Sequence, residues 1–237
     1  MSDMVTALAY ATIAGVAIPL GGLVAKVEHI QPRWLDEEFR HSVIAFGGGV
    51  LLAAVALVLV PAGMADLAPT PAVLSFAAGG IAFFLIDRMI ERQGGAAAQL
   101  MAMLLDFVPE AMAMGAMLAT EASTGLLLAL LIALQNLPEG FNAYREILAT
   151  GRIGRGALLA LLCLLVPLGP LAAWIGQEQM ADLPGLLGAI MLFASGGILY
   201  LTFEDIAPLA HLERHWAPPL GAVFGFLLGL WGHMLVA

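Results

Sequence analysis

The chain has 237 residues, of which 61% are hydrophobic and only 11% are charged, far below the roughly 25% charged residues of an average soluble domain. This composition indicates an integral membrane protein without a separate soluble domain. The formal net charge of −9 argues against a nucleic-acid partner, because phosphate binding needs a clustered basic surface. The single cysteine, Cys163, excludes a disulfide framework and a metal site built on paired cysteines.

Charge-poor stretches long enough to cross a bilayer follow one another along the chain, since about 20 apolar residues suffice for one crossing. The first is preceded by Asp3 and no basic residue, and it is longer than a signal-peptide core, so we interpret it as a retained helix. We predict an all-α integral membrane protein formed by one eight-helix domain, residues 1–237. The predicted spans are residues 4–25, 42–65, 69–90, 96–119, 122–147, 156–176, 183–209 and 216–237.

The basic residues give a direction to these spans, because cytoplasmic loops of membrane proteins collect Lys and Arg. With eight spans, all nine Lys and Arg residues fall on the side of the loops that follow the first, third, fifth and seventh spans. The opposite side carries acidic residues such as Asp66 and Asp182. The sequence therefore predicts a multi-pass protein of the cell membrane with both termini outside the cytoplasm.

A faint internal repeat relates the first three spans to the last three. A Pro-Leu-Gly step begins at Pro19 and again at Pro167, and a Gly-Gly pair precedes both Pro61 and Pro208. Because the related spans cross in opposite directions, we interpret this as an inverted repeat with the fourth and fifth spans paired, an arrangement common in secondary transporters. The alternative is chance recurrence of these short motifs in helices rich in Gly and Leu.

Two spans carry a Pro-Glu step at membrane depth. The fourth reads Asp106-Phe-Val-Pro109-Glu110, and the fifth reads Gln135-Asn136-Leu-Pro138-Glu139. An ionisable side chain at this depth costs roughly 2.5–3.5 kcal/mol on insertion scales and therefore indicates a functional site. Each proline also leaves the carbonyl four residues before it without its helical hydrogen bond.

These acidic and amide side chains predict a cation site. Asp106 and Glu110 share one helical face, and two carboxylates placed together repel each other unless a cation or a proton lies between them. The alternative is a set of protonated carboxyls held by hydrogen bonds between helices. We predict one divalent metal ion between the fourth and fifth spans, bound by Asp106, Glu110, Gln135, Asn136 and Glu139.

Further residues are candidates for the ion's pathway. Met103 and Met114 share the face of Asp106, where thioethers would suit a softer ion or serve only as flexible packing. Asn142 and Glu146 extend the polar face of the fifth span. The remaining candidates lie at the end of the seventh span: Glu204 and Asp205 as a relay or exit site, and His211, with His215, as a capture point or simply a solvated helix end.

At these residues the sequence resembles the ZIP (Zrt-/Irt-like protein) family of divalent-metal transporters, whose fourth and fifth helices carry His-Asn-x-Pro-Glu-Gly-like motifs. The likeness extends to Pro19-Leu-Gly-Gly, Asp87-Arg88, Pro167-Leu-Gly and the stretch from Tyr200 to Pro208. It implies eight helices, both termini outside, and alternating-access import of zinc, iron, manganese or a related ion such as cadmium. The metal is then a substrate; no cofactor and no enzymatic activity are expected, lipid is the surrounding partner, and a homodimer is left open.

The sequence also departs from the family pattern. Asp106 and Phe107 stand where the family has His-Asn, Gln135 stands where a His is common, and Val166 replaces a Glu before Pro-Leu-Gly. These departures predict one principal ion in place of a two-metal centre and a weaker preference for zinc over harder ions. A short connection at residues 93–95 replaces the family's His-rich loop. The lost ligands also motivate an alternative function, a membrane metal sensor or receptor that does not transport.

Overall fold

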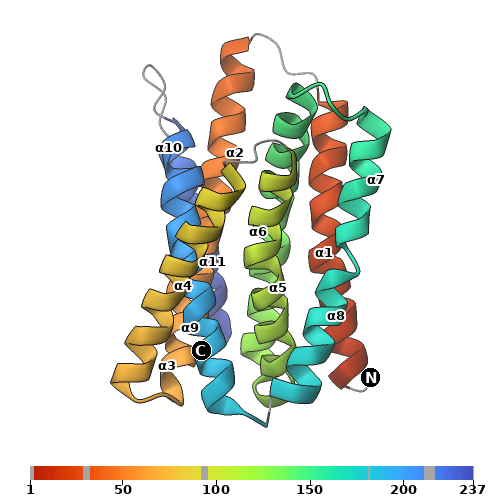
Figure 1. Ribbon diagram of the computed structural model, residues 1–237. Helices are drawn as coiled ribbons and strands as arrows, with labels where there is room; N and C mark the ends of the chain where they lie inside the picture. Colours follow the sequence, from red (N-terminus) through yellow and green to blue (C-terminus); the bar gives the residue numbers. More distant parts are fainter. Residues whose placement is uncertain (1–2, 29–32, 92–95, 181, 211–216, 237) are drawn as a thin grey trace.

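The computed structural model describes residues 3–28, 33–91, 96–180, 182–210 and 217–236, and within these ranges the chain is helical without a strand (Figure 1). Eight stretches are long and apolar enough to cross a membrane, so the chain has the architecture of a multi-pass membrane protein. Each predicted span coincides with one of them. They are Met4–Val27, Glu37–Ala65, Pro69–Met89, Met103–Thr120, Ala122–Ala149, Arg155–Met180, Pro184–Leu209 and Ala217–Val236.

Several of these spans are built from more than one helical element. The first, third, fourth, fifth and eighth are the single helices α1 (Asp3–Val27), α4 (Pro69–Glu91), α5 (Ala96–Thr120), α6 (Ala122–Ala149) and α11 (Ala217–Val236). The second joins α2 (Arg33–Ala54), the π-helix η1 (Val55–Leu59) and α3 (Val60–Ala65). The sixth joins α7 (Arg155–Leu165), α8 (Leu168–Ile175) and η2 (Gly176–Met180), and the seventh joins α9 (Pro184–Leu201), η3 (Thr202–Ile206) and α10 (Ala207–Leu209).

Proline accounts for most of these interruptions. The π-helices η1 and η3 both end two residues before a proline, Pro61 and Pro208. A proline has no N–H and its ring clashes with the carbonyl four residues earlier, so the helix widens locally into a π turn. In the sixth span, α7 ends just before Val166 and Pro167. The sequence predicted continuous spans, and these breaks are a finding of the structure.

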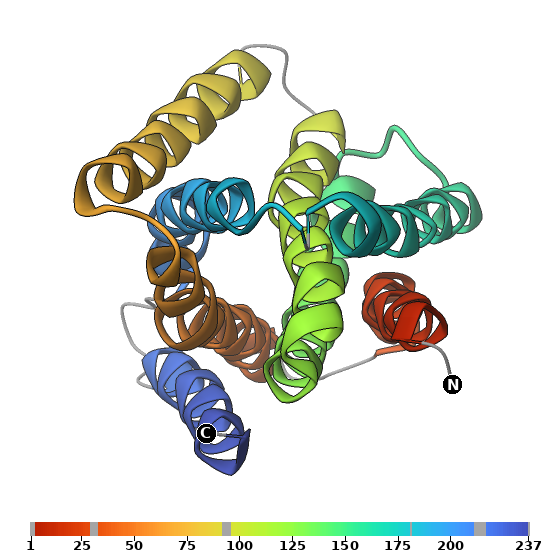
Figure 2. The same ribbon diagram turned by 90° about the horizontal axis from the view of Figure 1, so that it is seen from below.

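The helices form two packed groups on either side of the central pair α5 and α6 (Figure 2). On one side, α1 packs against α6, and α8 packs against α5 and α1. On the other side, α2 packs against α11 and α4 packs against α9. Contacts of α6 with α2 and of α5 with α9 join the second group to the central pair. The middle of the bundle is therefore formed by the two helices that carry the Pro-Glu steps.

Glycines bring α1 unusually close to α6. A Cβ atom on Gly21 would collide with the backbone of Leu137, and one on Gly140 would collide with the carbonyl oxygen of Ile18. Only glycine permits such an approach between helix backbones. The contact fixes the segment of α6 around Pro138 against α1.

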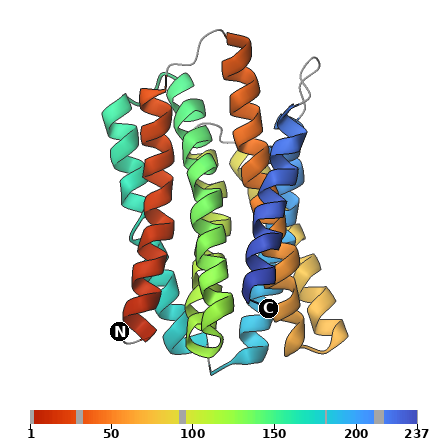
Figure 3. The same cartoon turned by 180° about the vertical axis from the view of Figure 1, so that it is seen from behind.

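The two ends of the bundle differ in charge. α1 begins and α11 ends at the same end (Figures 1 and 3). The opposite end, here called the basic end, is where α1 and α6 finish and α7 begins, and it carries Lys26, Arg145, Arg152 and Arg155. The outermost helices, α4 and α11, bury only 17% of their spanning windows inside the protein, and their exposed apolar side chains suit contact with lipid.

Candidate cation site

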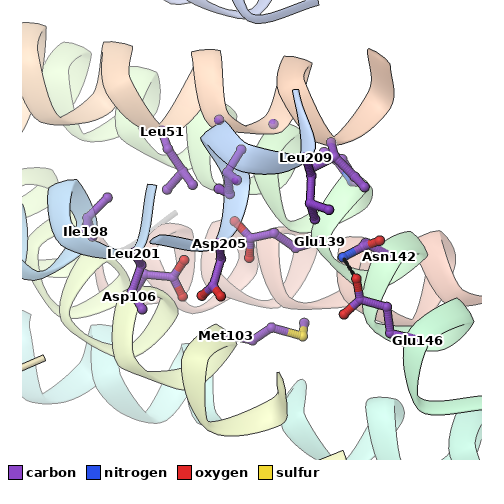
Figure 4. Close-up of a pocket in the computed structure, with 15 residues that line it drawn as sticks. Leu51, Met103, Asp106, Glu139, Asn142, Glu146, Ile198, Leu201, Asp205 and Leu209 are labelled. Carbon is purple, nitrogen blue, oxygen red and sulfur yellow. Dashed lines mark hydrogen bonds between the residues drawn. The ribbon is translucent and has the colours of Figure 1, made fainter. Parts of the chain in front are cut away.

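A cavity of about 110 Å³ lies between the central pair and the second helix group. Its polar wall is formed by side chains of α5, α6 and η3, which project into the same space (Figure 4). The lining includes no Lys or Arg among the described residues. The lining residues with a polar or thioether side chain are Met103, Asp106, Glu139, Asn142, Glu146 and Asp205. The other lining residues are Ile44, Gly47, Gly48, Leu51, Pro138, Ile198, Leu201, Ile206 and Leu209.

The opposite directions of α5 and α6 arrange the polar residues in layers. α5 starts at the basic end and α6 finishes there, so Met103 and Asn142 lie one turn nearer that end than Asp106 and Glu139. Glu110 lies one turn farther away and does not line the cavity. The cavity therefore occupies the half of the bundle that faces the basic end.

One layer of the cavity is acidic. The carboxylates of Asp106, Glu139 and Asp205 face one another across it (Figure 4). Asp106 is 6% exposed, and its Oδ1 accepts a 2.7 Å hydrogen bond from the backbone N–H of Phe107. Both carboxyl oxygens of Glu139 are buried and have no hydrogen-bond partner. Three helical elements thus each contribute a carboxyl group to the wall of the cavity.

A second polar pair lies behind this layer, completely buried. Gln135 Nε2 donates a hydrogen bond to Glu110 Oε2, which ties α6 to α5. The remaining oxygen of each side chain, Glu110 Oε1 and Gln135 Oε1, has no hydrogen-bond partner. Asn136 turns toward α1, where its Nδ2 donates to the carbonyl oxygen of Ala14 at 2.9 Å. The five predicted ligands therefore divide into two at the cavity, two behind it and one facing α1.

Unsatisfied acceptors are concentrated in this region. Burying a polar atom without a hydrogen bond costs free energy, so such atoms in native proteins need an explanation. Among the described residues, most buried side-chain polar atoms without a partner are oxygens of α6 and its neighbour Glu110. They are Glu110 Oε1, Gln135 Oε1, Asn136 Oδ1, Glu139 Oε1, Glu139 Oε2 and Asn142 Oδ1. Clustered carboxylate and amide oxygens are the donor set that divalent cations take from proteins.

Phe107 packs closely against two glycines. The ring is fully buried, and a Cβ atom on Gly169 of α8 would lie only 2.6 Å from its Cζ. A Cβ on Gly15 of α1 would lie 3.3 Å from the same atom and 3.0 Å from the carbonyl oxygen of Val166. The aromatic ring thus fills the space between α1, α5 and the break before α8.

The structure separates the remaining candidates into residues that line the cavity and residues that do not. Met103, Asn142, Glu146 and Asp205 line the cavity. Met114, by contrast, is fully buried in the apolar core. The side chain of Glu204 is exposed, and neither of these two lines the cavity. His211, His215 and the connection at residues 93–95 lie outside the described residues.

The sequence did not predict that α2 lines this cavity. Ile44, Gly47 and Gly48 nevertheless form one wall, and a Cβ on Gly47 would lie 2.8 Å from Cγ of Pro138. The run of three glycines was a signal for close helix approach, although it could not name the partner. α2 therefore meets α6 directly beside the Pro-Glu step.

Carboxylates alone do not complete a metal site in this arrangement. Within the described residues, no three His, Cys, Asp or Glu side chains are grouped as a metal-binding set. A cation bound in the cavity would need amide, carbonyl or thioether donors beside the carboxylates. Asn142 and Met103 are the lining residues that carry such groups.

Comparison of the sequence with known protein families and with curated proteins gives no match. The geometry of the cavity is therefore the basis for a functional conclusion.

Proposed function

We propose that this protein is a ZIP-like permease that moves a divalent metal cation such as zinc, iron(II) or manganese into the cytoplasm. The observation that carries this proposal is the group of six buried, unpartnered side-chain oxygens on α5 and α6 beside a cavity lined by acidic residues. Polar groups are expensive at membrane depth, so such a concentration favours a functional site over a packing one. The ion passes as substrate along the central helix pair.

The position of the cavity supports alternating access with the basic end facing the cytoplasm. The cavity extends toward the end that carries Lys26, Arg145, Arg152 and Arg155, and positive residues mark the cytoplasmic side of short-looped membrane proteins. Both termini then lie outside. In the other half of the bundle, α5 and α6 are enclosed by buried apolar residues, including Met114. This combination fits a state that admits ions from the cytoplasmic side only.

The packing pattern supports an inverted repeat. In such a repeat, the first three spans correspond in order to the last three, and the fourth span corresponds to the fifth. The contact of α1 with α6 then corresponds to the contact of α8 with α5, and the contact of α2 with α11 corresponds to that of α9 with α4. The structure contains all four contacts. The π turns before Pro61 and Pro208 are likewise equivalent. Repeats of this kind place substrate sites near the bilayer midplane.

The surroundings of Phe107 support a single principal ion. The resemblance to the ZIP family would place a second set of ligands at residues 107 and 166, where this chain has an aromatic ring packed on glycines and a valine. A ring in apolar contact offers no donor to a divalent ion. The proposed transporter therefore binds its substrate with the residues of the Asp106–Glu139 layer and the pair behind it.

Metal flux into liposomes tests this function. Purified protein is reconstituted, and uptake of Mn²⁺, Zn²⁺ and Fe²⁺ is followed with an encapsulated fluorescent indicator. Glu139→Gln removes a charge from the cavity and should reduce flux by roughly tenfold or more. Glu110→Gln should act in the same direction, because it changes the buried pair.

Glu178→Gln is the matched control, because Glu178 is an exposed acidic residue of η2, and its flux should equal that of the wild type. Normal flux in both Glu139→Gln and Glu110→Gln would overturn the proposed site. Saturable metal binding without any flux in the wild type would instead favour the sensor or receptor.

A further inference from the structure

We propose that the cavity contains a second cation position, nearer the basic end than the Asp106–Glu139 layer, formed by the Met103 thioether, the Asn142 amide oxygen and the Glu146 carboxylate. This position takes a borderline or soft divalent ion, of which Cd²⁺ is the diagnostic example. The inference rests on the proposed function, and it adds a residue that determines which ions the pathway accepts.

Helix geometry places Met103 and Asn142 at one level, with Glu146 one turn nearer the basic end. Met103 precedes Asp106 by three residues on α5, and Asn142 follows Glu139 by three residues on α6. Because the helices run in opposite directions, both steps lead toward the basic end, by about 4.5 Å at 1.5 Å per residue. Glu146 lies one turn beyond Asn142, and all three side chains line the cavity (Figure 4).

A hydrogen bond orients the donors on α6. Asn142 Nδ2 donates to Glu146 Oε1 at 2.9 Å, so the amide nitrogen is already occupied. Asn142 is 7% exposed, and its Oδ1 is buried without a partner in a cavity wall. The carboxylate of Glu146 keeps a second oxygen. The pair therefore presents oxygen acceptors to the cavity, and a cation is the ligand that satisfies them.

The sulfur of Met103 sets the class of ion. In Figure 4 its thioether extends into the space between the acidic layer and the Asn142–Glu146 pair. A thioether is a soft ligand that suits Cd²⁺, Cu⁺ and, less strongly, Zn²⁺, whereas Mn²⁺ and Mg²⁺ prefer oxygen alone. Met114 and Met191 belong to the same buried core cluster as Met103, but they do not line the cavity. Met103 therefore differs from these two methionines because its side chain lines the cavity.

The two positions are occupied in turn. Divalent ions about 4.5 Å apart repel each other strongly in a medium of low dielectric constant. One ion moving along α6 would exchange the carboxylates of Asp106 and Glu139 for the donors of the second position. A pathway needs such successive sites, each weak enough for the ion to leave.

Competitive binding to the full chain in lipid nanodiscs tests this inference, with Cd²⁺ and Mn²⁺ as the probes. Met103→Leu removes the sulfur and nearly conserves volume. We expect its Cd²⁺ affinity to fall by roughly tenfold, while its Mn²⁺ affinity stays within about twofold of the wild type. Met191→Leu is the matched control, because Met191 is 2% exposed and Met103 is 5% exposed, and it should bind both ions normally. The wild type should also show a cadmium–sulfur distance in X-ray absorption that Met103→Leu lacks.

The outcomes separate this inference from the proposed function. Unchanged Cd²⁺ affinity in Met103→Leu, or an equal fall for both ions, would overturn the second position while metal binding itself persists. Failure of the wild type to bind either ion would overturn both proposals. A fall in Met191→Leu as large as that in Met103→Leu would show a general packing effect and would also overturn the inference.

Discussion

The two halves of the α5–α6 pair have the same helical geometry but opposite surroundings. Toward the basic end, the pair lines a cavity with Asp106, Glu139, Asn142 and Glu146. Toward the other end, the same helices present fully buried apolar side chains such as Met114, Leu128 and Ile132. The boundary lies at the Glu110–Gln135 hydrogen bond. One half is thus built to hold charge, and the other is built to exclude water.

The difference lies in what closes each half. Close glycine contacts with the first helix group occur in both halves, since a Cβ on Gly115 of α5 would collide with the carbonyl oxygen of Ala173 in α8, and one on Gly140 of α6 with that of Ile18 in α1. In the cavity half, the cavity separates the surfaces of α2, α9 and η3 from the central pair α5 and α6. Close-packed interiors deform little, so we infer that a change of access requires the second helix group to shift as a unit against the central pair.

The largest effect on stability is expected from a substitution that disrupts packing in the apolar half, called the closed half below. Gly115→Leu would force a side chain into the backbone of α8, and overpacking of this kind typically costs 1–3 kcal/mol, occasionally more. The unfolding midpoint in detergent, followed by tryptophan fluorescence, should therefore fall clearly. Gly156→Leu is the matched control, because a Cβ on Gly156 would meet nothing within 4 Å. Similar midpoints for the two variants would contradict tight backbone packing in the closed half.

A second, intermediate effect concerns access of water to the two halves. In a Cys163→Ser background, a cysteine at Glu146 should react with a charged thiol reagent, because residue 146 lines the cavity. A cysteine at Leu128, which is 0% exposed in the closed half, should react slower by roughly tenfold or more, since reaction needs a solvated thiolate. Mass spectrometry of timed samples measures both rates. Equal rates would show that the closed half is not closed.

The sequence was sufficient for the helices and for the location of charge. Long apolar stretches separated by turn residues leave little choice in a bilayer, and each predicted span coincides with a candidate membrane span. The two Pro-Glu steps also indicated that α5 and α6 carry the polar groups. Both conclusions depend only on local composition, and for that reason they could be made before any tertiary contact was known.

The rotation of each helix could not be predicted from the sequence. Glu204 and Asp205 are adjacent and both acidic, yet only Asp205 lines the cavity, on the face that also carries Ile198 and Leu201. Likewise, Met103 and Met114 share a helical face by spacing and are both buried in the core, but only Met103 lines the cavity. Which face looks inward depends on contacts with distant helices. The wall from α2 was missed for the same reason.

The smallest effect is expected at the basic end, where an ion pair joins α6 to the residue that follows α1. Arg145 Nη1 lies 2.7 Å from Glu28 Oε2, and its guanidinium carbon lies 5.7 Å from the ring centre of Phe141. The two charged side chains are 25% and 13% exposed, so solvent screens the pair and its net contribution should be about 0.5–1 kcal/mol. The pair therefore adds little to stability compared with the backbone contacts of the closed half.

A double-mutant cycle of Arg145→Met and Glu28→Gln measures this coupling from unfolding midpoints at low and high KCl. The coupling should shrink as salt rises, because the Debye length falls from about 10 Å at 0.1 M to about 3 Å at 1 M. The destabilisation caused by Gly115→Leu should be unaffected by the same salt change, since it arises from steric overlap. If the Arg145–Glu28 coupling instead exceeded the cost of Gly115→Leu, the ion pair at the basic end and not the packing of the closed half would contribute more to the stability of the bundle.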